Sequence, residues 1–339
     1  MQRTHNVNNV TSLVLIPSVV TNMSRLNPKT SPLTNSPHPP HYVFHQTSWL
    51  RDPAHFPETL YSDYVINPRD LCPRDVTLDY VIVVHSAVDH FNRRRAIRET
   101  FGAKNITAPL TSRLVFLLGL TPDAGISTHI QNEAEAHGDV IQGDFLDTYH
   151  NLTLKGVMGL RWLTEYCPKV TTVVKIDDDV FLNIFRLTSF IFRKLDNKKH
   201  AIACALYRSG ESAILRSEEE KWKVDENEFP GLTHYPLDHC QGFLVLLTSE
   251  VIKPLYEASK VVPFFWIDDI YLFGLLPLVV GDVTFIPLLD FTRKVKYGRY
   301  CFQRNKVKCS FTAVYNNQFD EVRMRQMWGL LRDNNKTLL

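Results

Sequence analysis

From about residue 77 onward, short apolar runs alternate with segments of helical period. This alternation favours an α/β fold, in which helices flank a central sheet. We expect strands at seven apolar runs: residues 80–85, 113–118, 139–142, 170–176, 201–205, 242–247 and 283–286. We expect helices in five segments: residues 93–101, one beginning near 151, 183–195, 250–259 and 321–331. The second of these helices carries Leu154, Met158 and Trp162 on one apolar stripe.

Residues 1–76 differ in composition from the rest of the chain. The first 75 residues contain no glycine and ten of the nineteen prolines. The run from Pro28 to Pro40 mixes proline with Ser, Thr and Asn, and such a segment cannot build a packed face. We therefore expect a Pro-rich leader or stem, largely disordered, over residues 1–76. A single domain of catalytic size is expected over residues 77–339.

The composition excludes several classes of protein. A chain of 339 residues with 44% hydrophobic and 22% charged residues is typical of a globular protein, not of a disordered, collagen-like or coiled-coil one. The formal net charge of +2 is too close to neutral for a protein that binds nucleic acid through a broad basic surface. No run of about 18 consecutive apolar residues occurs, so we expect no membrane span. The apolar run 12–20 is shorter and contains Pro17, which makes it a weak signal-peptide core.

Cysteines and glycosylation motifs favour the secretory pathway. Six cysteines permit three disulfides, and the absence of CxxC pairs argues against a structural zinc site. Asn-x-Ser/Thr motifs are more frequent than chance predicts, and they begin at Asn9, Asn22, Asn105, Asn151 and Asn335. Asn105 and Asn151 are the glycosylation candidates inside the expected domain. A helix-capping role competes with glycosylation at Asn151, because a helix is expected to begin there.

The strongest local signal is an apolar strand that ends in three aspartates, Asp177, Asp178 and Asp179. Adjacent carboxylates repel one another unless a cation or hydrogen-bond donors neutralise them. Ligands of α/β sheets gather at the carboxyl ends of strands, and oxygen ligands there suit Mn²⁺ or Mg²⁺ with a diphosphate. The alternative is a polar turn in which Asp179 or Asn183 caps the next helix. An aspartyl phosphatase also carries Asp-x-Asp after a strand, but Lys175 within the strand and the mid-chain position argue against it.

Two further groups of charged residues indicate catalysis and phosphate binding. Asp268 and Asp269 follow an aromatic segment, and burial there would raise a carboxyl pKa and favour a general base. Both would equally suit a helix N-terminus. Arg94 and Arg98 lie one helical turn apart and could bind a diphosphate or an acidic partner, although a solvated helix face explains most such runs.

These segments together resemble a known family over residues 78–335. The matching motifs follow the family's order: Arg93-Arg94-x-Ala96-Ile97-Arg98-x-Thr100, Phe116-Leu117-Leu118-Gly119, Glu133, Gly138 to Lys155, Lys175 to Asn183, Lys221-Trp222-x-Val224, Tyr235-Pro236, Cys240-x-Gly242 and Asp268-Asp269-Ile270. They are similar to those of the β-1,3-galactosyltransferases and β-1,3-N-acetylglucosaminyltransferases, with Fringe as a distant relative. The resemblance implies a GT-A fold, with a mixed central sheet flanked by helices. It also implies an inverting transfer of a hexose from a UDP-sugar to a glycan hydroxyl on protein or lipid, in the Golgi.

The resemblance also implies a role for each matching residue. Asp269 would be the catalytic base, and Asp179 with Asp177 would hold Mn²⁺ or Mg²⁺. Donor-binding residues would be Asp178, Arg94, Arg98 and Lys155. Residues lining the acceptor cleft would be Trp222, Tyr235, Gly242 and Asp268. UDP-galactose is the favoured donor and UDP-N-acetylglucosamine the alternative; a family member that binds without turnover is the other possibility.

The sequence departs from the family pattern in several places. Phe101 stands where Trp is usual, and the segment from Pro236 to Cys240 holds one residue more than usual. No histidine follows His239, although the family commonly has a metal-binding one, so metal binding is open to question. The family's N-terminal membrane anchor is not visible, which indicates that the chain is truncated or that the protein travels by another route. By resemblance Cys167 would pair with Cys240, and by proximity Cys301 with Cys309, although sequence alone does not fix the pairing.

Overall fold

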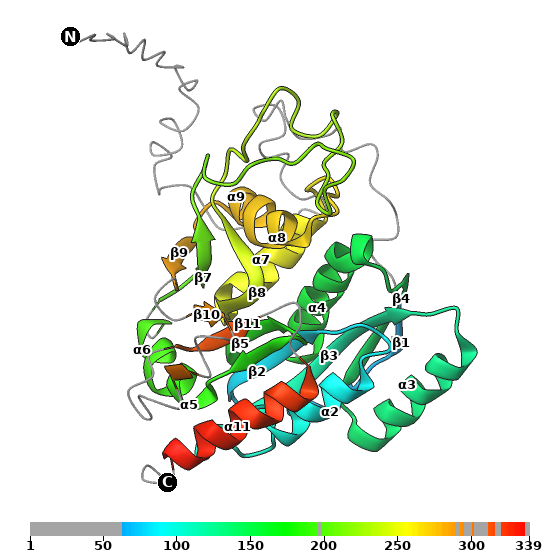
Figure 1. Ribbon diagram of the computed structural model, residues 1–339, viewed down its shortest axis with the longest axis vertical. Helices are drawn as coiled ribbons and strands as arrows, with labels where there is room; N and C mark the ends of the chain where they lie inside the picture. Colours follow the sequence, from blue (N-terminus) through cyan, green and yellow to red (C-terminus); the bar gives the residue numbers. More distant parts are fainter. Residues whose placement is uncertain are drawn as a thin grey trace, which may run out of the picture. The chain divides into compact units, whose positions relative to one another are not determined.

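The computed structural model describes residues 63–195, 198–288, 292–294, 300–301, 311–315 and 320–335 (Figure 1). They all belong to one compact unit, residues 51–339. Its centre is an eight-stranded sheet with the order β1-β4-β3-β2-β5-β8-β7-β9. The strands are β1 (Tyr64–Ile66), β2 (Leu78–His85), β3 (Ser112–Leu120), β4 (Val140–Leu146), β5 (Val170–Asp177), β7 (Ala201–Tyr207), β8 (His239–Thr248) and β9 (Thr284–Pro287). All seven expected strands are confirmed.

The sheet is mixed in direction. Strands β4, β3, β2 and β5 are parallel to one another, so their carboxyl ends lie at one edge. Strand β8 runs antiparallel to both β5 and β7, and its first residues therefore lie at the same edge. A smaller sheet joins β10 (Thr292–Lys294), β11 (Ala313–Tyr315) and β6 (Val180–Leu182). The expected α/β fold with a mixed sheet flanked by helices is confirmed.

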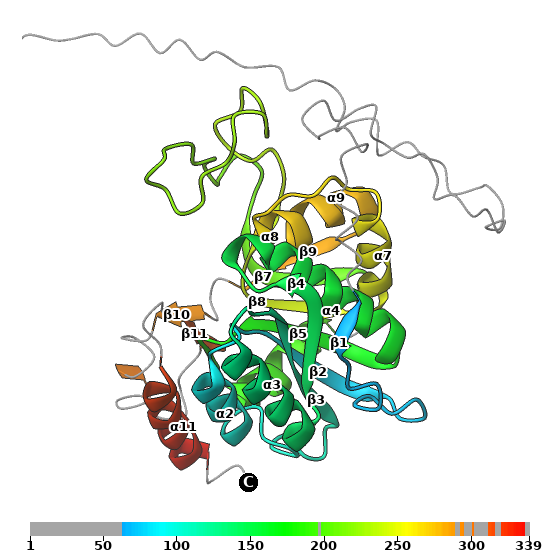
Figure 2. The same ribbon diagram turned by 90° about the vertical axis from the view of Figure 1, so that its right-hand side faces the viewer.

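Helices cover both faces of the large sheet (Figures 1 and 2). One face carries α2 (Phe91–Glu99), α3 (Ala124–His137) and α11 (Glu321–Asn335). The other carries α4 (Leu152–Tyr166), α7 (Ser249–Ser259) and a broken helix made of α8 (Asp268–Ile270), η7 (Tyr271–Leu275) and α9 (Leu276–Val280). The short turn η5 (Tyr149–Asn151) precedes α4, and the helix expected over 183–195 is divided into α5 (Ile184–Arg186), η6 (Leu187–Ile191) and α6 (Phe192–Leu195). Residues 208–238, between β7 and β8, extend away from the sheet as loops (Figure 2).

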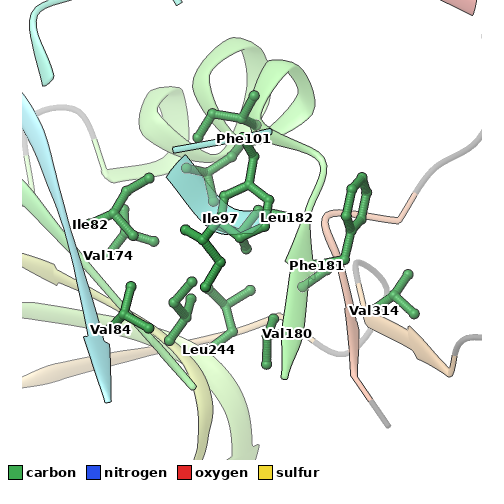
Figure 3. Packing of buried hydrophobic residues seen from close by; sticks show 14 of the residues in the cluster. Ile82, Val84, Ile97, Phe101, Val174, Val180, Phe181, Leu182, Leu244 and Val314 are labelled. Carbon is green, nitrogen blue, oxygen red and sulfur yellow. The ribbon is translucent and has the colours of Figure 1, made fainter. Parts of the chain in front are cut away.

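Alternation along β2 divides its side chains between two cores. Ile82 and Val84 point into the cluster that α2 and α11 cover, where they meet Ile97 and Leu244 (Figure 3). The next residues along the strand therefore face α4 on the opposite side. Phe101, which stands where the family has Trp, is fully buried and meets the ring of Phe181 edge-on. This departure from the family pattern therefore lies in the core.

Two disulfides correct the expected pairing. Cys72 is bonded to Cys167, and Cys204 is bonded to Cys240. The pairing of Cys167 with Cys240 is wrong, because Cys167 precedes β5 while Cys240 lies beyond its far end on the antiparallel strand β8. The pairing proposed for Cys301 involves Cys309, which lies outside the described residues. The first disulfide and the pairing of β1 with β4 extend the described folded part to residue 63, upstream of the expected boundary at 77.

Candidate active site

The three adjacent aspartates lie at the carboxyl end of β5, next to the end of β2. His85, the last residue of β2, is in register with Asp177. The chain then turns through Asp178 and Asp179 into β6, whose side chains are buried in the core. Strong apolar packing on both sides of the turn therefore fixes three carboxylates at the sheet edge where parallel strands end.

Asp178 is buried and binds the loop between β2 and the N-terminal part of α2 through hydrogen bonds. Its carboxylate accepts hydrogen bonds from Ser86 Oγ at 2.7 Å and Arg93 Nη1 at 2.8 Å, and it lies 2.7 Å from His90 Nδ1. Burial by itself would raise the pKa of Asp178, but the contacts with His90 and Ser86 and the charge of Arg93 hold it below its usual value. Its surroundings thus favour a role in holding the loop over direct donor contact.

Asp177 and Asp179 are more accessible than the residue between them. The side chain of Asp177 is 41% exposed, and that of Asp179 is partly buried. Burial, together with the charges of Asp177 and Asp178, raises the pKa of Asp179 to about 6, and the opposing charge of Arg93 is already paired with Asp178. Carboxylate oxygens are the hard ligands that Mn²⁺ and Mg²⁺ prefer. Asp177 and Asp179 could supply two such oxygen ligands, and the described part of the chain holds no group of three or more side chains arranged to bind a metal.

The second carboxylate pair begins α8 and is largely but not fully buried, with the side chain of Asp268 14% exposed. Burial and the adjacent charge of Asp268 raise the pKa of Asp269 to about 8, although Lys175 and a hydrogen bond from the Gly242 backbone lower it. Burial likewise raises the pKa of Asp268. The side chain of Asp269 lies against the backbone of β8: a Cβ added at Gly242 would be 1.9 Å from its Oδ1. At this position only glycine leaves room for the carboxylate.

Lys175 joins the two carboxylate groups that the sequence presents separately. It is buried on β5 and donates hydrogen bonds to Asp177 Oδ1 and to the carbonyl oxygen of Gly242, both at 2.7 Å. Burial would lower its pKa, but the charges of Asp177, Asp268 and Asp269 raise it, so Lys175 stays protonated. In the sequence, Lys175 only argues against a phosphatase and begins a motif that matches the family. Its position two residues before Asp177 was the signal that could have revealed this link.

The structure gives the three expected donor-binding cations other partners. Arg94 is fully buried, and its guanidinium donates two-pronged hydrogen bonds to Glu133 at 2.7 and 3.0 Å. Arg98 contacts Glu133 at 2.6 Å and Asp139 at 2.7 Å. Lys155 is also buried, and donates to Asp147 at 2.9 Å and to the carbonyl of Ser86 at 2.6 Å. All three pair with carboxylates or carbonyls of the surrounding elements, and their expected role toward a donor stays a prediction.

An exposed aromatic group lies beside the carboxylates. Trp222 Nε1 donates a hydrogen bond to Tyr149 Oη at 2.6 Å, and the Lys221 ammonium lies 4.0 Å from the centre of the Tyr149 ring. Trp266 meets Tyr149 edge-on. Burial and the charges of Asp268, Asp269 and Asp177 raise the pKa of Tyr149 to about 12, although the hydrogen bond with Trp222 lowers it. Sequence reasoning missed Tyr149 as a site residue, although it lies in the most specific matching motif.

Of the other cleft candidates, Tyr235 is in the core and Trp222 is on the surface. Tyr235 is buried and packs edge-on against Phe229 and Phe265, so it supports the loop, and its expected place in an acceptor cleft stays a prediction. Trp222 is 46% exposed.

The two candidate glycosylation sites differ in accessibility. Asn105 is exposed, in a surface turn with φ of 63°. The side-chain nitrogen of Asn151 donates to the carbonyl of Leu146 at 2.8 Å. Asn151 precedes α4 but makes no side-chain capping bond.

Comparison with known proteins agrees with this geometry. The family model described as galactosyltransferase matches residues 92–282, more than half of the chain. The chain is 34% identical over 191 residues to human beta-1,3-galactosyltransferase 5, covering 56% of this chain and 60% of that protein. It is 28% identical over 209 residues to mouse beta-1,3-galactosyltransferase 1, covering 62% of this chain and 63% of that protein. The chain belongs to the galactosyltransferase family, and it spans about three fifths of the length of these curated relatives.

The comparison with solved structures matches glycosyltransferases at low TM-scores. The apo structure of the WbbM bifunctional glycosyltransferase matches with a TM-score of 0.42 and 11% identity, covering 78% of this chain and 52% of that one. An active-site mutant of LgtC matches with a TM-score of 0.35 and 12% identity, covering 74% of this chain and 95% of that one. Among the described residues, no helix combines the length and the apolar character that crossing a membrane requires.

Proposed function

We propose that this protein is an inverting β-1,3-galactosyltransferase that moves galactose from UDP-galactose to a hydroxyl of a glycan on protein or lipid. The observation that carries the proposal is the link through Lys175. This residue holds the strand-end carboxylate Asp177 and the buried pair Asp268–Asp269 in one charged group. A transferase needs both parts, one for the leaving diphosphate and one for the acceptor proton. Family membership and the names of the relatives supply the sugar and the linkage.

In the proposed reaction, Asp269 acts as the base. Its ionised carboxylate takes the proton of the acceptor hydroxyl, whose oxygen attacks the anomeric carbon of galactose. The bond from that carbon to the diphosphate breaks, and UDP leaves with the electron pair, which inverts the configuration. The raised pKa of Asp269 suits this role, because a base whose pKa lies near the working pH combines ionisation with proton affinity.

We propose Mn²⁺ or Mg²⁺ as the cofactor, held by Asp179 and Asp177. When bound, the cation would supply positive charge at the leaving diphosphate. Asp178 keeps the loop between β2 and α2 closed against β5 through Ser86 and Arg93. Trp222 and Tyr149 offer an exposed aromatic surface of the kind on which a sugar ring stacks. We place the enzyme in the Golgi lumen, in line with the disulfides and the exposed Asn105 motif.

The test is a donor screen that measures UDP release with Mn²⁺, with and without β-linked acceptors. UDP-galactose is expected to give acceptor-dependent release, and faster release from UDP-N-acetylglucosamine would replace the donor assignment. Binding of UDP and Mn²⁺ without transfer to any acceptor would point to a family member that only binds. A phosphatase would release phosphate without needing a nucleotide sugar.

Two matched variants separate the proposed roles within the site. Asp179→Ala is expected to abolish metal-dependent UDP binding while the melting temperature of the free protein does not fall, because the variant removes a repelling charge. Asp269→Asn is expected to keep UDP binding and to lower kcat about 10²-fold or more, the usual scale for losing a general base. Normal UDP binding by the first variant would refute the metal assignment. Normal kcat in the second would mean that the base lies elsewhere, and Asp238 in the lengthened segment would be tested next.

A further inference from the structure

A large cavity lies at the edge of the sheet opposite the three aspartates. Its volume is about 820 Å³, and its walls come from residues 67–71, 101–104, 112–114 and 137–139. The third of these segments begins β3 and the fourth precedes β4, and both strands run parallel to β2 and β5. The amino ends of β3 and β4 therefore lie at the far edge from the strand-end carboxylates. Small-molecule sites commonly occupy roughly 300–1,000 Å³, so this cavity has room for a second ligand.

Basic side chains without an acidic partner line this cavity. Three cations have no carboxylate within ion-pair distance in the part of the chain that the structure describes: Arg69, Lys104 and Arg113. Two carboxyl groups also line it, and one of them, Asp139, is already paired with Arg98 at 2.7 Å. The other is Asp70, so four cations face two carboxylates, an excess of two positive charges with His137 left aside. An excess of this sign attracts anions.

Arg113 is the most firmly placed of these cations. It is half-buried at the start of β3, and its Nε donates to the carbonyl oxygen of Leu71 at 2.8 Å. Its Nη1 donates to the carbonyl oxygen of Ser112, also at 2.8 Å. Neutral carbonyl groups orient the guanidinium but do not cancel its charge, so it needs little further ordering when an anion binds. Lys104 and Arg69 are exposed on two other walls and can adjust to the ligand.

The rest of the lining indicates a ligand without an aromatic ring. Neither tyrosine nor tryptophan lines the cavity, and Phe101, which does, is fully buried. A nucleobase would therefore find no exposed ring on which to stack, in contrast to the surface formed by Tyr149 and Trp222. Two excess positive charges are balanced best by a ligand with at least two acidic groups. Arginine binds the oxygens of such groups through paired hydrogen bonds.

We propose that this cavity binds a compact, non-aromatic molecule with two or more phosphate or sulfate groups, which Arg113, Lys104 and Arg69 contact. Phosphorylated polyols and sulfated saccharides share this chemistry. The site is separate from the candidate active site, and the proposal stands whether or not the protein transfers galactose. Binding should weaken as salt is raised, because mobile ions screen exposed charges.

The test is titration calorimetry in metal-free buffer with two probes, inositol trisphosphate and sucrose octasulfate. At least one of them is expected to bind about 10-fold or more tightly than inorganic sulfate and than its own uncharged scaffold, inositol or sucrose. The tighter probe identifies phosphate or sulfate as the preferred group. Failure of both probes to bind, or equal binding of the uncharged scaffolds, would overturn the proposal. Displacement of the probe by excess UDP would also overturn it, because the probe would then occupy the donor site.

A charge reversal at one exposed wall residue locates the site. Lys104→Glu is expected to raise the Kd of the tighter probe about 10-fold or more. Lys253→Glu makes the same change of charge at an exposed position of α7 outside the lining, and it should leave that Kd within about threefold. Equal effects of the two variants would refute a localised site, since net charge alone would then explain binding. The bound probe should also slow amide hydrogen exchange at residues 67–71 and 101–104, and unchanged exchange there would contradict the assignment.

Discussion

Replacing Gly242 with alanine is the most direct perturbation of the proposed base. The added Cβ would be 1.9 Å from Asp269 Oδ1, whereas ordinary contact begins near 3.4 Å. The oxygen must therefore move by the difference, 1.5 Å, or β8 must shift. Backbone movement is limited by the hydrogen bond that the Gly242 carbonyl accepts from Lys175 and by the neighbouring residues Gln241 and Leu244, which pair with β7 and β5. We expect the carboxylate to be displaced, since it lies at the end of a side chain.

The expected effect is on turnover more than on donor binding. A displacement near 1 Å of a catalytic group costs on the order of 10²-fold in rate, so kcat of Gly242→Ala should fall at least that far. Donor binding should change by less than about threefold, because the strand-end carboxylates are not touched. Overpacking should lower the free energy of unfolding by about 1–3 kcal/mol. The assay is UDP release at saturating donor and acceptor, with UDP binding and urea unfolding measured in parallel.

A matched control comes from an exposed position on helix α11. A Cβ added at Gly329 would meet nothing within 4 Å, so Gly329→Ala should keep full activity and gain about 0.5–1 kcal/mol in stability. If Gly242→Ala keeps kcat within threefold of wild type and the control behaves as expected, the contact between Gly242 and Asp269 does not position the base.

Four further predictions test separate parts of the structure. Glu133→Gln should cost on the order of 3 kcal/mol in urea unfolding, because it removes the charge that pairs two largely buried arginines; a loss below 1 kcal/mol would contradict this. Replacing Cys72 and Cys167 with serine opens a loop of 95 residues and should cost about 4–5 kcal/mol in the same assay. Since the pKa of Asp269 is raised to about 8 and only its ionised form accepts a proton, kcat/KM should rise with pH through the neutral range; a flat profile down to pH 5 would be inconsistent with that base. Trp222→Ala should raise the acceptor KM about 5- to 10-fold through lost stacking and leave UDP binding unchanged.

The fold could be predicted from the sequence because its strands are runs of apolar residues that become buried in the sheet. Seven apolar segments each became a strand, with boundaries within a few residues of those expected. The elements that were missed have weak local signals. β1 has three residues, and α3 buries only Ile130, so its position depends on the caps Asp123 and Gly138 more than on an apolar stripe. The broken helix that begins with Asp268 and Asp269 was foreseen only as a possible helix start.

The site was predictable by residue type and less so by role. Motifs in the sequence indicate which charged residues matter, but not which charges neutralise one another across the sheet. Arg94 and Arg98 of α2 suggest a phosphate site until both are seen to pair with Glu133 of α3, a contact across 35 to 39 residues. The pairing of Cys240 failed for a similar reason, because the direction of β8 depends on tertiary structure. Such partners are fixed only by the tertiary packing of helices and strands that are far apart in the sequence.

The three neighbouring aspartates lie in three different environments, because their side chains point in different directions. Asp177 faces Lys175 and the α8 side, Asp178 is surrounded by donors from the loop after β2, and Asp179 is dominated by burial and by the two carboxylates before it. The lowered pKa of Asp178 shows that its charge is already neutralised by neighbouring groups. The charge of Asp179 is not balanced in this way, so Asp179 is the strongest candidate for binding a cation. Because Lys175 is shared between Asp177 and the pair at α8, neutralising Asp177 with a bound cation would leave more of the Lys175 charge for Asp269. Donor binding would then favour the ionised base, which couples the two halves of the site through a single buried lysine.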